Sequence, residues 1–323
     1  MRIGSEAETV REIFLGEVIR QRRVELRLTQ EEVCEGICEP ITISRLENGK
    51  QTPSRNRVKA LLQRLGLPDD RFYGLLSAKE LEISRLEKEI VSCNVRFERA
   101  QGEEKKVVRA EALAKLQELE QVIDGDDTLS QQLILRSRYL LGTEQGRYDF
   151  ETGMALLLEA MRLTKPRFDI RQIEKGLYTE QEVKLINNMA LCYSRADKHV
   201  EALDILRQLL GYLQTSWKKI LPHRAHIPFI AYNYARELGI VKRYAEAIDI
   251  AEEAKNICIN YGHYQFLPGL LAVLAECSFF AGDSARSAAL YRQAYYLYET
   301  IKNEKDRSTI QAEAREHLGM ILE

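Results

Sequence analysis

The chain has 323 residues, of which 45% are hydrophobic and 30% charged, and its formal net charge is -2. This length is enough for two domains or one extended array. The nearly balanced charge excludes a protein coated with basic residues, but it allows a small DNA-reading module. No apolar run reaches the about 20 residues of a membrane span, and the N-terminus lacks a signal-peptide core, so we expect a cytoplasmic protein without a membrane partner. The six cysteines are scattered and far from the histidines, so we expect no metal and no cofactor.

Residues 10–27 are predicted to form the first helix, because Ile13, Phe14, Val18 and Ile19 give it one apolar face. A second, short helix begins after Thr29. Thr29 is a good N-cap, and Glu32 three residues later completes a capping box. This helix places Val33 toward a core and ends at Gly36, which adopts turn conformations that other residues resist.

Pro40 suits the first turn of a third helix, where its missing N–H has no cost. Ile43 and Leu46 lie three residues apart and face inward together. Asn48 and Gly49 end the helix, since both tolerate a left-handed backbone. The outward face is predicted to carry Pro40, Ile41, Ser44 and Arg45, with Thr42 at its flank. Two short helices around a glycine turn, the second with a polar and basic face, are typical of a helix-turn-helix that enters the DNA major groove.

A fourth helix is predicted after the Thr52-Pro53-Ser54 turn, since Val58, Leu61, Leu62 and Leu65 form a helical stripe. Gly66 and Pro68 end it, and the apolar residues of 72–76 predict a short closing helix. Residues 1–76 therefore read as a complete small all-α domain.

Residues 15–76 resemble the DNA-binding domain of lambda-repressor-type (XRE) regulators. The resemblance rests on Leu-Thr-Gln-Glu-Glu from Leu28, followed by Ile-Ser-Arg-Leu-Glu-Asn-Gly-Lys from Ile43. It implies that Gln30 bonds DNA phosphate, that Arg23 forms a structural ion pair with Glu47, and that the remaining DNA contacts come from Pro40, Ile41, Thr42, Ser44, Arg45, Asn48 and Lys50. Within this set, Arg45 is the best candidate base reader, because a guanidinium fits guanine O6 and N7 bidentately. A phosphate contact is its alternative role.

Residues 77–123 are charged, helical in pattern and almost free of helix breakers, and Gly102 splits them into two helices. We expect an antiparallel hairpin, with a coiled-coil dimer arm as the alternative. The amphipathic faces are predicted to carry Leu81, Leu86, Ile90 and Phe97 on the first helix and Val107, Leu113, Leu116 and Leu119 on the second.

From Asp126 onward the chain reads as helix pairs. Aligning 187–206 with 232–251 matches Asn188 with Asn233, and a third copy follows at 271–298. Two helices per unit, at a spacing of roughly 40–45 residues and with small residues where helices cross, predict a stacked α-solenoid. The unit resembles the tetratricopeptide repeat. Residues 77–323 are thus expected to form a tetratricopeptide-like body with five helix pairs from Lys79 and a last helix near 305–322.

In tetratricopeptide proteins, asparagines on the inner face clamp the backbone of an extended peptide. Asn188 and Asn233 occupy matching sites, and an amide side chain can pair with a peptide backbone as a strand does. Further candidates for this peptide site are Asn187, Tyr232, Arg236, Lys184 and Arg136. The alternative is that both matched asparagines occupy solvated helix positions.

An XRE-type module followed by such a body resembles the RRNPP group of peptide-pheromone-responsive regulators of Gram-positive bacteria, which includes PlcR and Rgg. The resemblance implies quorum sensing: a homodimer that binds a short signalling peptide in the body and changes its binding to a near-palindromic double-stranded DNA operator. The alternative is a DNA-tethered scaffold that recruits a protein partner. An enzyme is disfavoured, because the sequence has no Gly-rich phosphate loop, no nucleophile elbow and no paired His–carboxylate motif.

Overall fold

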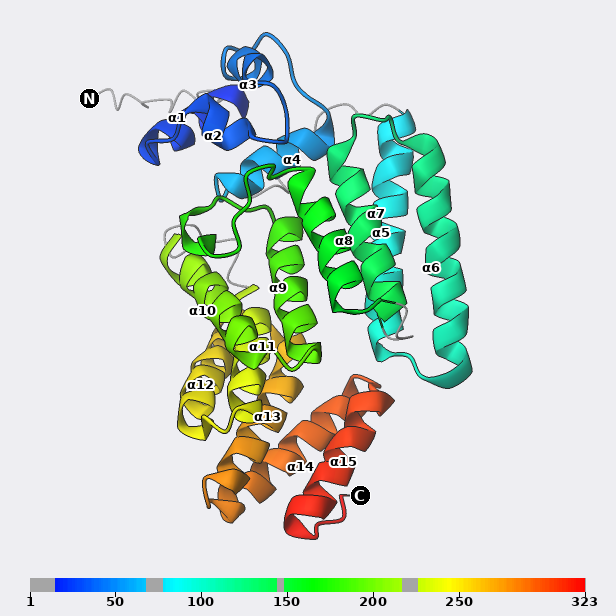
Figure 1. Cartoon of the computed structure of the whole chain (residues 1–323), viewed down its shortest axis with the longest axis vertical. Coiled ribbons are helices and arrows are strands. Elements are labelled where there is room, and N and C mark those ends of the chain that lie inside the picture. Colours follow the sequence, from blue (N-terminus) through cyan, green and yellow to red (C-terminus); the bar gives the residue numbers. More distant parts are fainter. Residues whose placement is uncertain (1–14, 68–77, 144–147, 217–225, 323) are drawn as a thin grey trace, which may run out of the picture.

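The computed structural model describes residues 15–67, 78–143, 148–216 and 226–322. These residues form an all-α structure without strands, as predicted (Figure 1). The α-helices of the N-terminal domain are α1 (Leu15–Glu25), α2 (Gln30–Cys34), α3 (Pro40–Glu47) and α4 (Arg55–Arg64). Those of the body are α5 (Ala78–Arg99), α6 (Gly102–Val122), α7 (Thr128–Thr143), α8 (Phe150–Arg162), α9 (Glu180–Arg195), α10 (His199–Ser216), α11 (His226–Ile240), α12 (Tyr244–Tyr261), α13 (Leu267–Phe280), α14 (Ser284–Thr300) and α15 (Glu304–Leu318). None of the described helices is both long enough and apolar enough to span a bilayer.

The start and end signals of α2 and α3 are confirmed. Thr29 and Glu32 form both hydrogen bonds of the capping box, and Pro40 stands in the first turn of α3. Gly36 and Gly49 both have a φ of +67°. The predicted start of the first helix at residues 10–14, the predicted closing helix at 72–76 and the boundary between the domains lie outside the described residues.

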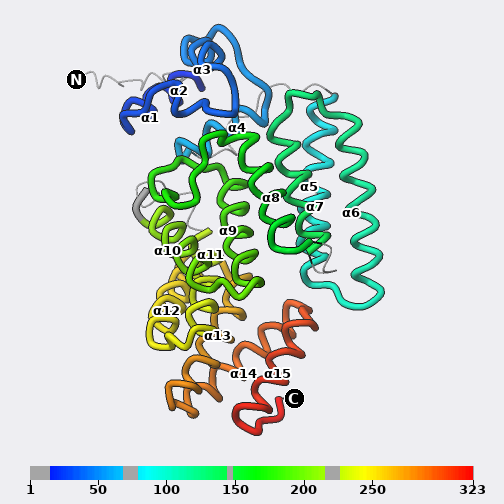
Figure 2. The backbone as a smooth tube through the Cα atoms, in the orientation of Figure 1, coloured from blue at the N-terminus to red at the C-terminus, as the bar shows by residue number. Residues whose placement is uncertain are grey.

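The hairpin prediction is correct: α5 and α6 run antiparallel and pack on each other and on α7 (Figure 2). Its apolar register is only partly correct. Leu86, Ile90 and Phe97 are buried in α5, but Leu81 is exposed. In α6 the buried face is formed by Val108, Ala112, Leu116 and Leu119, whereas Val107 and Leu113 are exposed. The core face of α6 therefore begins one residue later than the apolar pattern predicted, and it includes an alanine where the helices approach closely.

Five helix pairs from α5 to α14 and the final helix α15 agree with the predicted solenoid. The first helices of three successive pairs end in the same way. The backbone N–H groups of Lys198, Arg243 and Asp283 each donate to the carbonyl five residues earlier, after a residue with positive φ. This is the hydrogen bond of a Schellman turn. A repeated turn rotates each pair by a similar amount, so the body curves until α15 contacts α5 (Figure 1). At this contact Lys305 Nζ donates to the carbonyl oxygen of Glu98 at 3.3 Å.

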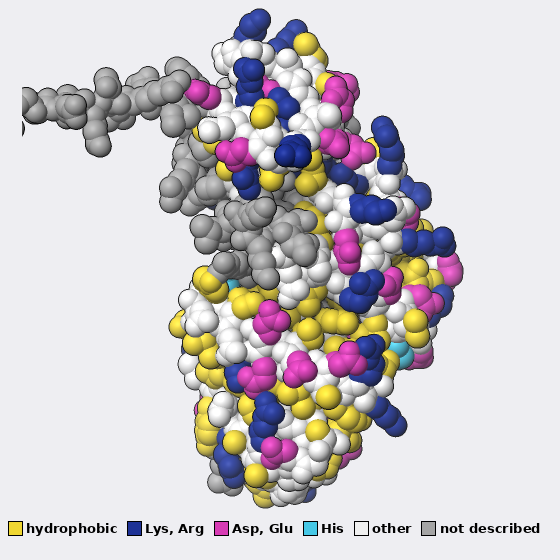
Figure 3. All heavy atoms as spheres, turned by 90° about the vertical axis from the view of Figure 1, so that its left-hand side faces the viewer, with side chains coloured by type: hydrophobic (Ala, Val, Ile, Leu, Met, Phe, Trp, Pro, Cys, Tyr) yellow, Lys and Arg dark blue, Asp and Glu magenta, His cyan; other side chains and the backbone are white. Residues whose placement is uncertain are grey.

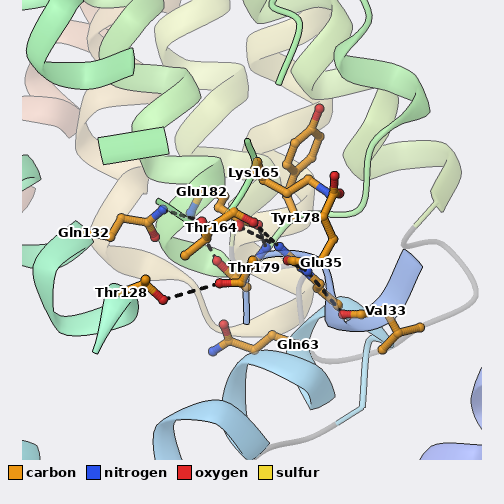
Figure 4. A network of polar contacts seen from close by, with 12 residues as sticks. Val33, Glu35, Gln63, Thr128, Gln132, Thr164, Lys165, Tyr178, Thr179 and Glu182 are labelled. Atoms are coloured by element: carbon orange, nitrogen blue, oxygen red, sulfur yellow. Dashed lines mark hydrogen bonds and ion pairs between the residues drawn. The ribbon is translucent and has the colours of Figure 1, made fainter. Parts of the chain in front are cut away.

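A buried ion pair joins the N-terminal domain to the body. Arg64 on α4 and Glu182 on α9 are both fully buried, and Arg64 Nη2 lies 2.9 Å from Glu182 Oε1. Arg64 also donates to the carbonyl oxygens of Val33 and Thr164 at 3.2 and 3.1 Å. Glu182 in turn accepts from the Thr179 backbone at 2.6 Å, because it is the third residue of the capping box of α9. Figure 4 shows how these partners converge from both domains.

Gly36 brings the two domains into direct backbone contact. A Cβ atom at Gly36 would lie 2.0 Å from the carbonyl oxygen of Thr164, so no other residue fits without moving the domains apart. Thr128 Oγ1 donates to the Gly36 carbonyl at 3.3 Å, and Lys165 Nζ lies 2.7 Å from Glu35 Oε2. The turn of the helix-turn-helix therefore contacts the body, on the side of the domain opposite to the outward face of α3.

Replacing Arg64 should be among the most destabilising changes in the chain. Arg64→Met leaves the fully buried Glu182 without its cation, which is expected to lower the free energy of unfolding by about 3–5 kcal/mol in urea denaturation. Arg64→Met with Glu182→Gln should recover most of this loss, since Gln removes the buried charge. Arg85→Met is the control, because Arg85 is an exposed residue whose ion pairs contribute little. An equal effect of Arg64→Met and Arg85→Met would contradict this account.

Candidate functional site

The predicted DNA-reading face of α3 is open to solvent. Ile41 is 57% exposed and Arg45 is also exposed, while Pro40, Thr42 and Ser44 are half-buried. Ile43 and Leu46 face the core of the domain. α3 lies at the end of the molecule, on the side of the N-terminal domain away from the body (Figure 1). Nothing in the described part of the chain covers this face.

The predicted ion pair between Arg23 and Glu47 is present and bidentate, with distances of 2.7 and 2.9 Å. Gln30 Nε2 also donates to Glu47 Oε2 at 2.8 Å. Burial alone would raise the pKa of Glu47, but the hydrogen bonds from Arg23 and Gln30 outweigh it and hold that pKa below its usual value. One amide hydrogen of Gln30 is thus used to fix its position, and the second remains for the expected phosphate contact.

The remaining predicted contacts follow the end of α3. Arg45 Nη1 donates to Gln51 Oε1 at 3.4 Å, a weak contact for an exposed side chain. Asn48 Nδ2 donates to the Ser44 carbonyl at 2.7 Å, so Asn48 caps the helix. Its contact with the DNA backbone stays a prediction. Lys50 is exposed. Figure 3 shows Lys and Arg side chains spread over this end of the molecule, mixed with acidic ones.

The three asparagines predicted for the peptide site are buried, so the alternative that Asn188 and Asn233 occupy solvated positions is wrong. Asn187, Asn188 and Asn233 are at most 6% exposed. Asn233 Nδ2 donates to Asn187 Oδ1 at 2.8 Å, which makes Asn187 its partner in this structure. The Nδ2 atoms of Asn187 and Asn188 are buried without a hydrogen-bond partner among the described residues. A buried donor without a partner costs free energy, and a ligand that accepts from it would recover that cost.

The other predicted peptide-site residues lie on the helices that face the inside of the curve. Arg136 on α7 donates to Gln181 Oε1 at 3.5 Å, and burial lowers the pKa of Arg136 to about 10, although Glu98 opposes the shift. The pKa of Lys184 is also lowered, mainly by burial and secondly by repulsion from Arg136. Tyr232 on α11 packs closely against α13: a Cβ atom added at Gly269 would lie 2.9 Å from the Tyr232 ring. Arg236, one turn further, is exposed. The structure therefore places the basic candidates on α7, α9 and α11.

The far end of the same inner side is acidic. Glu313 on α15 is half-buried, and its pKa is raised to about 7, first by burial and then by repulsion from Glu276 and Glu316. Glu276 lies on α13, so two helices contribute to this acidic group. The inner side therefore changes from basic near α7 and α9 to acidic near α13 and α15.

The sequence pattern did not point to a role for Arg64 or Glu182 in joining the domains. The pattern Thr179-Glu180-Gln181-Glu182 signals a capping box, and this box is present. An arginine between Leu62 and Leu65 in an apolar stripe is a signal of a buried charge, but it does not identify a partner 118 positions away in the chain.

The shifted pKa of Glu313 predicts a pH dependence of stability. The folded protein retains a proton on Glu313 that the unfolded chain releases between its ordinary pKa of 4.5 and about 7. Its contribution to stability is therefore present below pH 4.5 and is lost as the pH rises to 7. Glu313→Gln should unfold in urea with nearly the wild-type free energy at about pH 4, and should be more stable by about 1–3 kcal/mol at about pH 8. Glu304→Gln, at an exposed site on the same helix, is the control. An equal effect of Glu313→Gln at both pH values would refute the assignment.

Comparison with known proteins agrees with this reading. Residues 15–72 match a family model described as a helix-turn-helix domain. No curated protein matches the chain. Among solved structures, Bacillus thuringiensis PlcR in complex with the peptide PapR7 and DNA is 19% identical with a TM-score of 0.60, over 92% of this chain and 98% of that one. The SHP pheromone receptor Rgg2 of Streptococcus dysgalactiae is 14% identical with a TM-score of 0.46, over 94% and 100% of the two chains. The resemblance predicted from the sequence is thereby confirmed for domain and fold: residues 15–72 match the helix-turn-helix domain model, and the chain joins this domain to a tetratricopeptide-like body in a fold similar to that of PlcR.

Proposed function

We propose that this chain is a sequence-specific transcriptional regulator whose DNA binding is controlled by a short signalling peptide on the inner side of the repeat body. The observation that carries the proposal is the combination of an uncovered α3 face with buried, unpaired amides on the helices of the body. The solved PlcR complex contains both a peptide and DNA. That combination in a protein of the same fold supports the assignment of a peptide to this body.

The regulator is proposed to act as a homodimer on a near-palindromic operator. A single α3 reads only one half-site, and helix-turn-helix proteins gain affinity by presenting two such helices one or two DNA turns apart. A peptide alters DNA binding only if it has different affinities for two arrangements of the protein. Chromatin footprinting with and without spent culture medium tests the whole proposal: footprints at defined operators that change with the medium are expected, and identical footprints would oppose it.

The role of Arg45 is testable on DNA. Arg45→Ala should weaken binding to the operator by about 1–3 kcal/mol while hardly changing binding to random DNA, since a base contact carries the specificity. Lys50→Ala is the matched control. As a phosphate contact it should weaken both by similar factors and reduce the salt dependence of binding. Equal losses on operator and random DNA for Arg45→Ala would make Arg45 a phosphate contact instead.

The role of Asn188 is testable with a peptide. Because its Nδ2 has no partner in the part of the chain that the structure describes, Asn188→Ala should not lower the melting temperature. It should nevertheless weaken peptide binding about tenfold, as expected for one lost hydrogen bond. Asn233→Ala serves as the comparison, because it breaks the bond to Asn187 and should lower stability as well. The assay is calorimetric titration with binders selected from a short-peptide library. Unchanged affinity in Asn188→Ala would place the peptide elsewhere, and a pull-down that retains a protein instead would favour the scaffold alternative.

A further inference from the structure

A pocket of about 340 Å³ lies where the DNA-binding domain meets the body. One wall comes from α4 through Arg55, Asn56, Lys59 and Gln63. The opposite walls come from α5, from the start of α7 and from the first residues of α9, 179–181 and Lys184. We call this space the junction pocket. It holds about ten water volumes of about 30 Å³, which is enough for the end of a peptide.

Positive charge is concentrated around the junction pocket. Lys59 and Lys184 line it from the two domains, and Arg136 approaches it through its contact with Gln181. The lowered pKa of Lys184 has burial as its main cause, with repulsion from Arg136 and Lys59 also contributing. Lys184 on α9 is thus repelled by cations of two other helices. Arg136 Nε is buried without a hydrogen-bond partner among the described residues.

The side chains that line the junction pocket carry more positive than negative charge: four are basic and two are acidic, namely Arg55, Lys59, Lys88 and Lys184 against Glu87 and Glu180. Glu87 already accepts from Asn56 and Ser130 at 3.0 and 3.1 Å. Burial, the main cause, raises the pKa of Glu87, which disfavours its charged form. An anion entering the pocket would therefore meet net attraction.

The junction pocket and the candidate peptide-binding residue Asn188 share one face of α9. Gln181, Lys184 and Asn188 are spaced three and four residues apart, so they share one face of α9. Asn188 is 4% exposed and its Nδ2 lacks a partner among the described residues. A ligand that begins in the pocket and follows α9 would meet the cations first and this amide next. The acidic residues Glu276 and Glu313 lie beyond, on α13 and α15.

On these grounds we propose that the junction pocket binds the C-terminal carboxylate of the peptide ligand between Lys184 and Arg136 of the body and Lys59 of the DNA-binding domain. This assignment rests on the proposed function. The amino end of the peptide then points toward Glu276 and Glu313, where negative charge favours it. The ligand touches α4 directly, so the DNA-binding domain itself contributes to peptide recognition.

The test compares two pooled heptapeptide libraries that differ only at the C-terminus, one with the free acid and one with the amide. Full-length protein is used for affinity selection with mass spectrometry, and each binder is then titrated by calorimetry in both forms. The free acid is expected to bind at least about tenfold more tightly than its amide. Lys59→Gln and Lys184→Gln should each remove most of this difference by weakening the acid form alone. Lys106→Gln, at an exposed lysine of α6, is the matched control and should change neither.

The possible outcomes separate this inference from the proposed function. If peptides bind but the free acid and the amide have equal affinity, the junction pocket is not the carboxylate site. The same follows if Lys59→Gln binds the free acid as tightly as wild type. In both cases the proposed peptide-controlled regulator still stands. If neither library yields a binder, the proposed function fails and the inference fails with it. Acetate and phosphate are tested alone: Lys59-dependent stabilisation by these ions, without acid-selective peptide binding, would assign the pocket to a free anion and overturn the peptide assignment.

Discussion

A buried guanidinium–carboxylate pair holds the DNA-binding domain on the repeat body. Arg64 and Glu182 are fully buried and 2.9 Å apart, and such a pair is stable only while its geometry and its other hydrogen bonds are kept. Those bonds reach both domains: Arg64 also binds the Val33 and Thr164 carbonyls, and Glu182 also accepts from Thr164 Oγ1 at 2.6 Å. Separating the domains would therefore break this ion pair together with its hydrogen bonds. This fixes the outward direction of α3.

The same pair links the DNA-binding domain to α9, the helix that carries candidate ligand-binding residues. Glu182 is the N-terminal cap partner of α9, and Lys184 and Asn188 follow on that helix. A ligand that shifts α9 would move Glu182, and with it the bonds that hold Arg64. Contiguous contacts alone do not prove coupling, since coupling requires two arrangements with different affinities for the ligand. The structure provides one of these arrangements and the contacts through which a second would have to be reached.

Local signals predicted much of the fold. Thr29, Gly36 and Pro40 gave the helix ends of the DNA-binding domain, because caps and turns depend on a few neighbouring residues. The repeat number followed from small residues and turns that recur along the chain. The face of α6 was placed incorrectly, since Val107 and Val108 are equally apolar and only packing against α5 selects Val108. Nor did the sequence reveal that Asn233 pairs with Asn187 or that Arg64 meets Glu182, because both contacts join distant segments whose relative placement depends on the whole curve of the body.

The central claim is that a peptide on the body and DNA on α3 bias the same equilibrium. Thermodynamic linkage makes this reciprocal: if the peptide changes operator affinity by some factor, the operator must change peptide affinity by the same factor. The most direct measurement is calorimetric titration of a selected peptide into the full-length protein alone and into its complex with operator DNA. The account predicts two different affinities whose ratio equals the change in operator affinity caused by the peptide. The same peptide affinity with and without operator would contradict it.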